Sequence, residues 1–216
     1  KYEIPVHFNT EADLDLIKTI RPDHLVIAQG ARPLVPPIEG IDGPGVISSW
    51  EVLKNNPFLG KNVAVIGGGA VGLETALFVA HKGTLSPEML HFLVTYDAMD
   101  LDRLKHYMFT GSCRVTVFEM QEKAGQDVGK STKWILMSNL KRYGVRVLTQ
   151  TRVVSIKSGQ VEFETGGKTG TERFDTVIPA LGSAPVRDIE DQVKDLGIPF
   201  SAAGDCVTPG KISHAI

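Results

Sequence analysis

Residues 61–72 have the sequence KNVAVIGGGAVG, in which four apolar residues lead directly into three glycines. The apolar run 63–66 is typical of a buried strand in a parallel sheet. Residues 70–82 (AVGLETALFVAHK) then place apolar side chains at helical spacing, and Gly83 follows where a helix would end. A strand, a tight turn and a helix in this order predict the first part of a Rossmann-like, doubly wound α/β domain.

The glycine pattern also predicts what this turn binds. In Gly67-x-Gly69-x-x-Gly72 the first glycine permits the tight turn, the second lets the backbone approach a pyrophosphate, and the third allows helix and strand to pack closely. The helix N-terminus, which includes Ala70 and Val71, supplies N–H groups and the positive end of a dipole for an anion. We therefore expect a dinucleotide here, the alternative being a purely structural turn.

A second predicted strand, 114–119 (RVTVFE), ends in a carboxylate. At that position Glu119 can accept hydrogen bonds from the hydroxyl groups of the adenosine ribose, whereas an ordinary solvated carboxylate is the alternative. The usual separation from the first glycine is about 20 residues, but here it is 119 − 67 = 52. A carboxylate repels a 2′-phosphate, and residues 120–122 (MQE) offer no arginine, so NADH is favoured over NADPH.

A helical insertion at 84–113 accounts for the long separation. Its helix-start signal is Ser86-Pro87-Glu88, and two helix-like patterns follow before Gly111. Its leucines and aromatic residues are expected to form a small satellite core, with a partner surface as the alternative; the aromatic residues are Phe92, Tyr96, Tyr107 and Phe109.

The rest of the chain continues the α/β pattern. A short strand over 2–8 and a helix over 11–20 are expected first. After Glu119 the pattern predicts a helix over 130–143, a strand over 145–148, a hairpin or meander from 153–156 and 160–165, and a strand over 176–180.

The chain also resembles itself. Residues 23–33 (DHLVIAQGARP) align with 175–185 (DTVIPALGSAP) at a constant offset, 182 − 30 = 152. Two strands that each stop at Gly-x-x-Pro predict two related α/β units. Because only one Gly-rich strand-to-helix turn is present, the first unit lacks its beginning, and we expect the chain to be a fragment of a longer protein.

Composition excludes several classes of function. The 216 residues are 42% hydrophobic and carry 25 acidic and 23 basic side chains, a net charge of −2 without a basic stripe for nucleic acid. No apolar stretch is long enough to span a membrane, so we expect a globular, cytoplasmic protein. Cys113 and Cys206 are too far apart for a CxxC or zinc motif, and the six histidines show no metal spacing, so no metal site is predicted.

Three further positions are candidates for cofactor contacts. Glu74 could face the nicotinamide or simply favour the helix dipole. Gly182, followed by Ser183, could approach the cofactor cleft or form a plain turn. Asp205 ends a strand-like run at Gly204-Asp205, where it could bind a flavin ribityl or ribose hydroxyl group or belong to an ordinary turn. No catalytic acid, base or nucleophile is predicted, which fits hydride transfer, in which the cofactors supply the reactive atoms.

These motifs resemble the pyridine nucleotide-disulfide oxidoreductase superfamily of flavoproteins. Residues 26–33 (VIAQGARP) are similar to its ATG segment, with Gln29 where threonine is usual, 67–76 to its NAD fingerprint, and Gly204-Asp205 to its GD motif. Residues 84–134 and 204–212 are most similar to the C-terminal part of old-yellow-enzyme-like NADH:flavin oxidoreductases, the relatives of 2,4-dienoyl-CoA reductase and trimethylamine dehydrogenase.

The resemblance implies a domain plan and a function. It implies an NAD(H)-binding domain at 46–185, flanked by parts of a split FAD-type domain at 1–45 and 186–216. FAD contacts would come from Gly30 and Asp205, and a further barrel carrying FMN and an iron–sulfur cluster would be the missing partner. Hydride would pass from NADH to FAD in the intact enzyme. A CxxxxC pair is absent, which disfavours the disulfide-reducing branch.

Two other functions remain open from the sequence. The chain could bind a nucleotide without turnover. It could also be an autonomous NAD-dependent dehydrogenase, which needs a proton-transferring histidine, lysine or tyrosine beside the nicotinamide; the sequence offers no convincing candidate.

Overall fold

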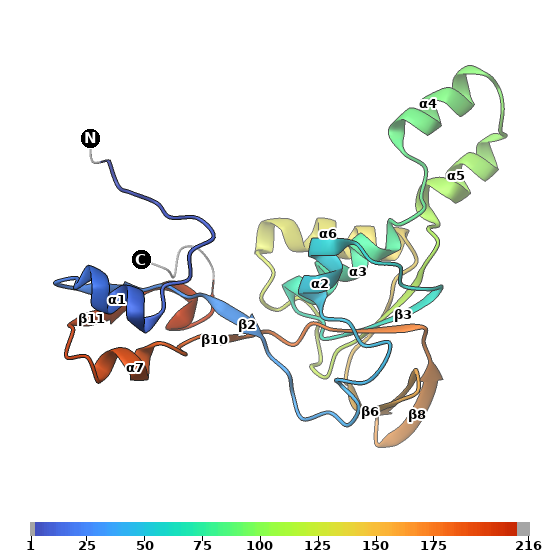
Figure 1. Cartoon of the computed structure of the whole chain (residues 1–216). Coiled ribbons are helices and arrows are strands. Elements are labelled where there is room, and N and C mark those ends of the chain that lie inside the picture. The colour runs from blue at the N-terminus through green and yellow to red at the C-terminus, as the bar shows by residue number, and fades with distance from the viewer. Residues whose placement is uncertain (1–2, 211–216) are drawn as a thin grey trace. The chain divides into compact units, whose positions relative to one another are not determined.

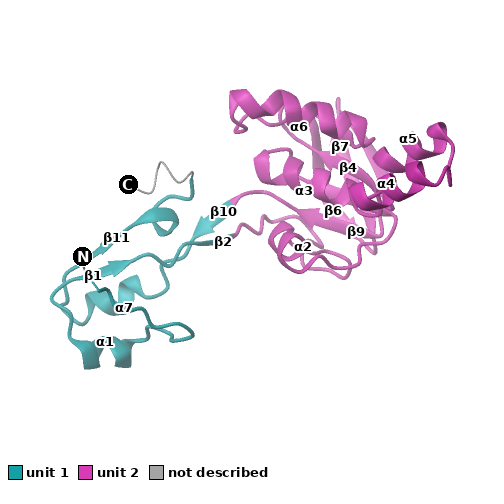
Figure 2. Cartoon of the chain, turned by 90° about the horizontal axis from the view of Figure 1, so that it is seen from above, with its two compact units in different colours: residues 1–32, 183–216 teal, residues 33–182 magenta. Residues whose placement is uncertain are grey.

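The computed structural model of the chain describes residues 3–210 and forms two compact units. Unit 2 comprises Pro33–Gly182, and unit 1 comprises Lys1–Arg32 with Ser183–Ile216 (Figure 2). The sequence placed the main domain at 46–185. Residues 33–45 belong to the same compact unit, in which Ile38 and Ile41 pack against the core, whereas residues 183–185 belong to unit 1.

A parallel sheet of four strands forms the centre of unit 2. Its order is β5-β4-β3-β9, and all neighbours are parallel. The strands are β3 (Asn62–Ile66), β4 (Arg114–Phe118), β5 (Arg146–Leu148) and β9 (Thr176–Pro179). The predicted Rossmann-like α/β fold is therefore confirmed.

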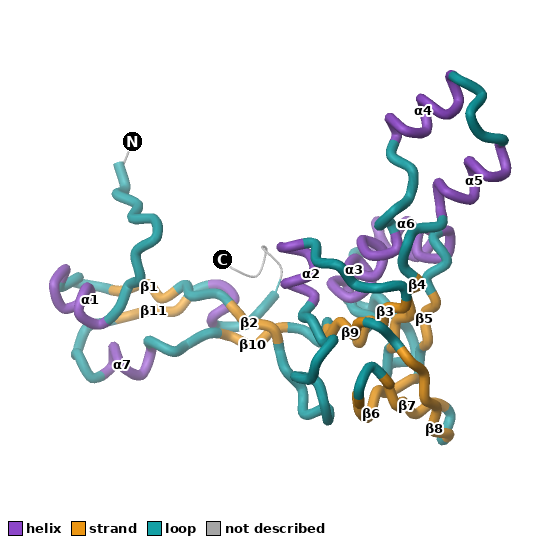
Figure 3. The backbone as a smooth tube through the Cα atoms, turned by 45° about the vertical axis from the view of Figure 1, so that its right-hand side comes forward, coloured by secondary structure: helices purple, strands orange, loops and turns teal. Residues whose placement is uncertain are grey.

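Each face of this sheet has its own cover. Helices α2 (Ser49–Asn55), α3 (Ala70–Ala80) and α6 (Lys130–Arg142) lie on one side, and an antiparallel sheet lies on the other (Figure 3). That second sheet is β6 (Thr151–Lys157), β7 (Gln160–Thr165) and β8 (Lys168–Arg173), a meander whose third strand was not predicted.

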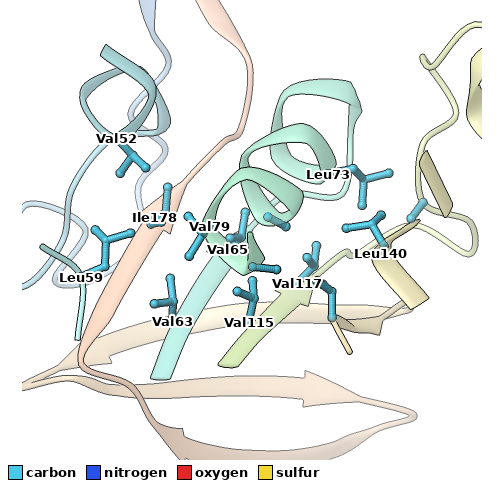
Figure 4. Packing of buried hydrophobic residues seen from close by; sticks show 14 of the residues in the cluster. Val52, Leu59, Val63, Val65, Leu73, Val79, Val115, Val117, Leu140 and Ile178 are labelled. Atoms are coloured by element: carbon cyan, nitrogen blue, oxygen red, sulfur yellow. The ribbon is translucent and has the colours of Figure 1, made fainter. Parts of the chain in front are cut away.

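Alternation along the strands builds the two cores. Val63 and Val65 of β3 point to the helical side, where they pack with residues such as Leu73 of α3 and Leu140 of α6 (Figure 4). Ala64 and its alternate neighbours point to the meander instead. Because both faces are buried, β3 needs apolar residues throughout, as its sequence shows.

Unit 1 contains short elements around two small sheets. Strand β1 (Leu25–Ile27) pairs in parallel with β11 (Phe200–Ala202), and β2 (Ala31–Pro33) pairs with β10 (Ser183–Pro185). The remaining elements are α1 (Leu14–Ile20), α7 (Glu190–Lys194) and the 3₁₀ turn η1 (Gly204–Cys206).

The strand expected over 2–8 is wrong for the described residues 3–8. They form no strand, and the side chains of Ile4, Val6 and Phe8 are 77%, 65% and 82% exposed. Their alternating pattern has no neighbouring strand in the described structure, so nothing buries their apolar side chains.

The internal repeat has a structural counterpart in two matching turns. Gly30 and Gly182 both adopt positive φ, +78° and +98°, which glycine accommodates without strain. The Leu34 N–H donates to the Gly182 carbonyl, and the Val186 N–H donates to the Gly30 carbonyl, each at 3.0 Å. The two donors, Leu34 and Val186, are 186 − 34 = 152 residues apart, and the two acceptors, Gly30 and Gly182, are 182 − 30 = 152 residues apart. Both separations equal the offset of the internal repeat.

The insertion forms helices α4 (Pro87–Thr95) and α5 (Leu101–Phe109), which project from the rest of unit 2 (Figure 1). Ser86 and Asp100 cap them by accepting backbone N–H groups. The satellite-core prediction is wrong for most of the aromatic residues, because Phe92, Tyr96 and Tyr107 are 52%, 69% and 39% exposed. The helices are too short to enclose them, and Leu104 is the one buried residue of the pair.

Three further observations concern residues 3–210. None of their helices is long and apolar enough to cross a membrane. Both cysteines are free. The described part of the chain has no cluster of histidine, cysteine and acidic side chains suited to a metal.

The Asp175 side chain forms hydrogen bonds with the backbone at the start of β3. Its carboxylate accepts the N–H groups of Asn62 and Lys61 at 2.8 and 2.9 Å, and these bonds keep the pKa of Asp175 below its usual value. A lowered pKa in the folded state stabilises the fold above the unfolded pKa, and this contribution disappears as pH falls through the folded pKa.

We predict that Asp175→Asn lowers the melting temperature at pH 7 and that the difference from the wild type shrinks as pH falls below about 4. Thermal melts by circular dichroism from pH 7 to pH 3 measure this, with the exposed Asp42→Asn as a charge-matched control. A difference that stays constant over the range would contradict the assignment.

Candidate dinucleotide-binding site

A cleft of about 580 Å³ lies within unit 2, beside the Gly-rich turn and the carboxyl ends of β3, β4 and β9. Such a position is where open parallel sheets bind ligands. The cleft is mostly apolar, and its lining residues are Leu34, Pro36, Pro37, Ile38, Ile66, Gly67, Gly69, Ala70, Val71, Phe118, Glu119, Met120, Asp127, Thr151, Arg152, Val153, Val154, Ala180, Leu181 and Gly182.

The first and third glycines of the motif have the expected structural roles. Gly67 has φ +107°, and a Cβ atom there would lie 2.4 Å from the Ala180 carbonyl oxygen. At Gly72 a Cβ atom would lie 2.0 Å from the Gly67 carbonyl oxygen. The turn therefore depends on the absence of side chains at both positions, and it directs the N-terminus of α3 toward the cleft.

Glu119 lies at the end of β4, and its carboxylate faces the turn. One oxygen accepts the Gly68 N–H at 2.6 Å, and the other accepts the Gln121 N–H at 2.7 Å. The residue is only 9% exposed, so the alternative of a solvated strand-end carboxylate does not describe it. A carboxylate has about four acceptor sites, so two remain for ligand hydroxyl groups.

Asp127 is a second carboxylate at this turn, and the sequence did not single it out. Its Oδ1 and Oδ2 atoms lie 2.9 and 3.0 Å from the Ala70 N–H, at the first residue of α3. A Cβ atom on Gly69 would lie 3.1 Å from Oδ2. The acid therefore occupies the place where the glycine motif predicts an anion.

Arg152 of β6 is the one basic residue in the lining, and the sequence analysis missed it. Residues 120–122 contain no arginine, and Arg152 comes from a strand that follows β5. Its signal in the sequence is a basic residue four positions after the end of β5. No lysine, histidine or tyrosine lines the cleft among the described residues, and its ionisable acids are the carboxylates of Glu119 and Asp127.

The other candidates of unit 2 have different positions. Gly182 lines the cleft, with open space where a Cβ atom would stand. Glu74 is exposed, lies beyond the first turn of α3 and does not line this cleft.

The two FAD candidates lie together in unit 1. Gly30 follows β1, Asp205 follows β11, and these parallel strands bring their carboxyl ends to one edge. The Ala203 N–H donates to the Ile27 carbonyl at 2.9 Å, which continues this pairing toward the two residues. Asp205 is exposed and accepts the Gly210 N–H at 3.1 Å, so its carboxylate has free acceptor positions.

Comparison with known families agrees with this geometry. The family model described as pyridine nucleotide-disulphide oxidoreductase matches residues 7–215. The chain belongs to this family. Flavin and NAD(H) are the cofactors that the family implies. The Gly-rich turn presents the start of α3 to the cleft, where a pyrophosphate would be held, and the strand ends of unit 1 offer a glycine with open space around it and the Asp205 carboxylate, which accepts one backbone N–H among the described residues.

Several family relatives are reductases or oxidases. The chain is 35% identical over 99% of its length to a metal reductase of Desulforamulus reducens, 30% over 94% to a bilirubin reductase of Mediterraneibacter gnavus, and 27% over 99% to an NADH oxidase of Thermoanaerobacter brockii. It spans only 27% to 32% of the length of these relatives.

A solved structure of similar fold is a 2-naphthoyl-CoA reductase in complex with 2-naphthoyl-CoA. Its TM-score is 0.75 at 28% identity, and the match covers 96% of this chain and 27% of the reductase. The chain is thus an oxidoreductase-family module that corresponds to about a quarter of that protein.

We predict that Gly72→Ala destabilises the fold by about 1–3 kcal/mol or more, because the new methyl group meets the Gly67 carbonyl oxygen. Urea unfolding measures the loss. Gly129→Ala is the matched control: its Cβ atom would lie 3.6 Å from the nearest atom, and its φ is −56°. Equal stability of the two variants would contradict the packing role of Gly72.

Proposed function

We propose that this chain is the NAD(H)-binding region of a flavin-dependent oxidoreductase. In the intact enzyme NADH, held at Gly67–Gly72, supplies a hydride that FAD accepts. One observation carries the proposal: the Glu119 carboxylate bonds to Gly68, so an acceptor for ribose hydroxyl groups and the donors for a pyrophosphate share one cleft.

Different residues would bind different parts of the coenzyme. The first N–H groups of α3, at Ala70 and Val71, and the helix dipole favour the pyrophosphate. Glu119 accepts from the adenosine ribose. The apolar walls, which include Pro36 and Leu181, exclude water from the flat faces of the rings.

Coenzyme preference depends on two opposing charges. The buried Glu119 carboxylate repels a 2′-phosphate and favours NADH. Arg152 lines the same cleft and supports NADPH as the second candidate, because a guanidinium group binds phosphate with several donors. The negative group is fixed by two hydrogen bonds, and on this ground we propose NADH.

The electron acceptors belong to the proposal as well. Gly30 and Asp205 would contribute to an FAD site together with further parts of a longer protein. A barrel with FMN and an iron–sulfur cluster, as in old-yellow-enzyme-like NADH:flavin oxidoreductases, is the proposed partner. Nucleic acid and membrane are not proposed as partners.

The rival functions have less support. An autonomous dehydrogenase needs a proton-transferring histidine, lysine or tyrosine beside the nicotinamide, and the described lining of the cleft contains none of these three residue types. A nucleotide-binding module without catalysis remains the alternative, and flavin reduction by NADH in the longer protein distinguishes it.

We predict that Glu119→Ala weakens NADH binding by about tenfold or more, because hydrogen bonds to a charged acceptor are lost, while NADPH binding is unchanged or stronger. Isothermal titration of each coenzyme measures both. Glu122→Ala, an exposed acid on the same segment, is the control and should keep the NADH preference.

The variant Arg152→Ala tests the contribution of the arginine to coenzyme preference in the same titrations. It should leave NADH binding unchanged and weaken NADPH only. If the wild type preferred NADPH and lost that preference in Arg152→Ala, the NADH assignment would be wrong, and absence of binding by either coenzyme to folded protein would overturn the proposed site.

A further inference from the structure

Asp127 places a negative charge where the proposed function needs a phosphate. Both of its carboxylate oxygens lie within 3.0 Å of the Ala70 nitrogen, the first residue of α3. The Gly69 Cα also lies close, since a Cβ there would be 3.1 Å from Oδ2. The carboxylate thus takes the same backbone donor that a pyrophosphate takes in a Gly-rich turn.

The two anions cannot share this donor. An N–H group directs one strong hydrogen bond, and a phosphate oxygen bound to Ala70 would lie within a few ångströms of the Asp127 carboxylate. Unit charges about 4 Å apart repel by roughly 1 kcal/mol even in water. Among residues 3–210, no basic side chain forms an ion pair with Asp127 that would offset this repulsion.

The carboxylate is free to leave while its segment stays in place. Asp127 is exposed, but Ala124, three residues earlier, is only 6% exposed within the helical-side core. The Gly125 N–H donates to the Gly68 carbonyl at 2.7 Å, and Val128 packs against the same core. A side-chain rotation of Asp127 therefore suffices to clear the donor.

We propose that Asp127 is a built-in competitor of the dinucleotide: it caps α3 in the empty site and is displaced when a pyrophosphate binds to Ala70. This inference rests on the proposed function, since it names what regulates affinity at the same site. The acid stabilises the empty turn as an N-terminal cap would, and it weakens binding, because only the fraction of molecules with a displaced side chain is competent.

The inference predicts opposite effects of one substitution. Asp127→Ala should lower the melting temperature of the empty protein by a few degrees, because α3 loses its acceptor. The same variant should bind NADH about fivefold more tightly or better, because the competing charge is gone. A residue that only supports the fold would not improve binding when removed.

Isothermal titration with NADH and thermal melts of the wild type, Asp127→Ala and Asp127→Asn test this. Asp127→Asn keeps the shape and one acceptor without the charge, so it should gain affinity with a smaller loss of stability. The matched control is Asp100→Ala, which removes one acid and one N-terminal cap, on α5. It should lower stability and leave NADH binding unchanged.

The outcomes separate the two proposals. Tighter binding by both Asp127 variants, with Asp100→Ala equal to the wild type, supports displacement. If the wild type binds NADH and both Asp127 variants bind equally or more weakly, the inference is overturned while the proposed function stands. If the wild type and both folded variants all fail to bind, both are overturned.

Discussion

The close approach of Gly72 to the Gly67 carbonyl oxygen is the constraint on which the central part of unit 2 depends. It lets the chain leave β3 and enter α3 within a few residues, so that the helix lies on the sheet and its N-terminus opens on the cleft. Leu73 and Val79 of α3 are then fully buried in the helical-side core. Any side chain at Gly72 would separate helix and strand, and with them the donors from the acceptor at Glu119.

The same turn explains why two carboxylates, Glu119 and Asp127, line the site. Backbone N–H groups at a helix N-terminus attract anions, and two carboxylates accept hydrogen bonds from this turn. Glu119 is buried and held by two backbone N–H groups, whereas Asp127 is exposed and bonds to one. Their different burial gives them different proposed roles: a fixed partner for the ribose and a displaceable partner for the helix.

The sequence predicted those elements whose pattern of apolar residues and glycines is recognisable within a short segment. The strand β3, the turn, α3 and the carboxylate at Glu119 follow from a short stretch of sequence and from one alternating strand. The meander strand β8 (KTGTER) was missed because it has no apolar alternation. The strand expected over 2–8 failed for the opposite reason, since its alternating residues find no partner strand among those described.

Asp127 and Arg152 could not be predicted from local sequence patterns, because contacts between segments far apart in the sequence place them at the cleft. Asp127 lies 57 residues from Ala70, and its position is set by the burial of Ala124. Arg152 reaches the cleft on a strand of the second sheet. Glu74 does not line the cleft that the turn forms, so its contact with the nicotinamide stays a prediction from its place in the motif.

A crystal structure of this chain with NADH tests the central claim most directly. The account predicts the pyrophosphate at the N-terminus of α3, with a phosphate oxygen within hydrogen-bond distance of the Ala70 nitrogen and the adenosine ribose hydroxyl groups on Glu119. NADH bound elsewhere on the chain, with the Gly67–Gly72 turn still free of phosphate, would contradict it.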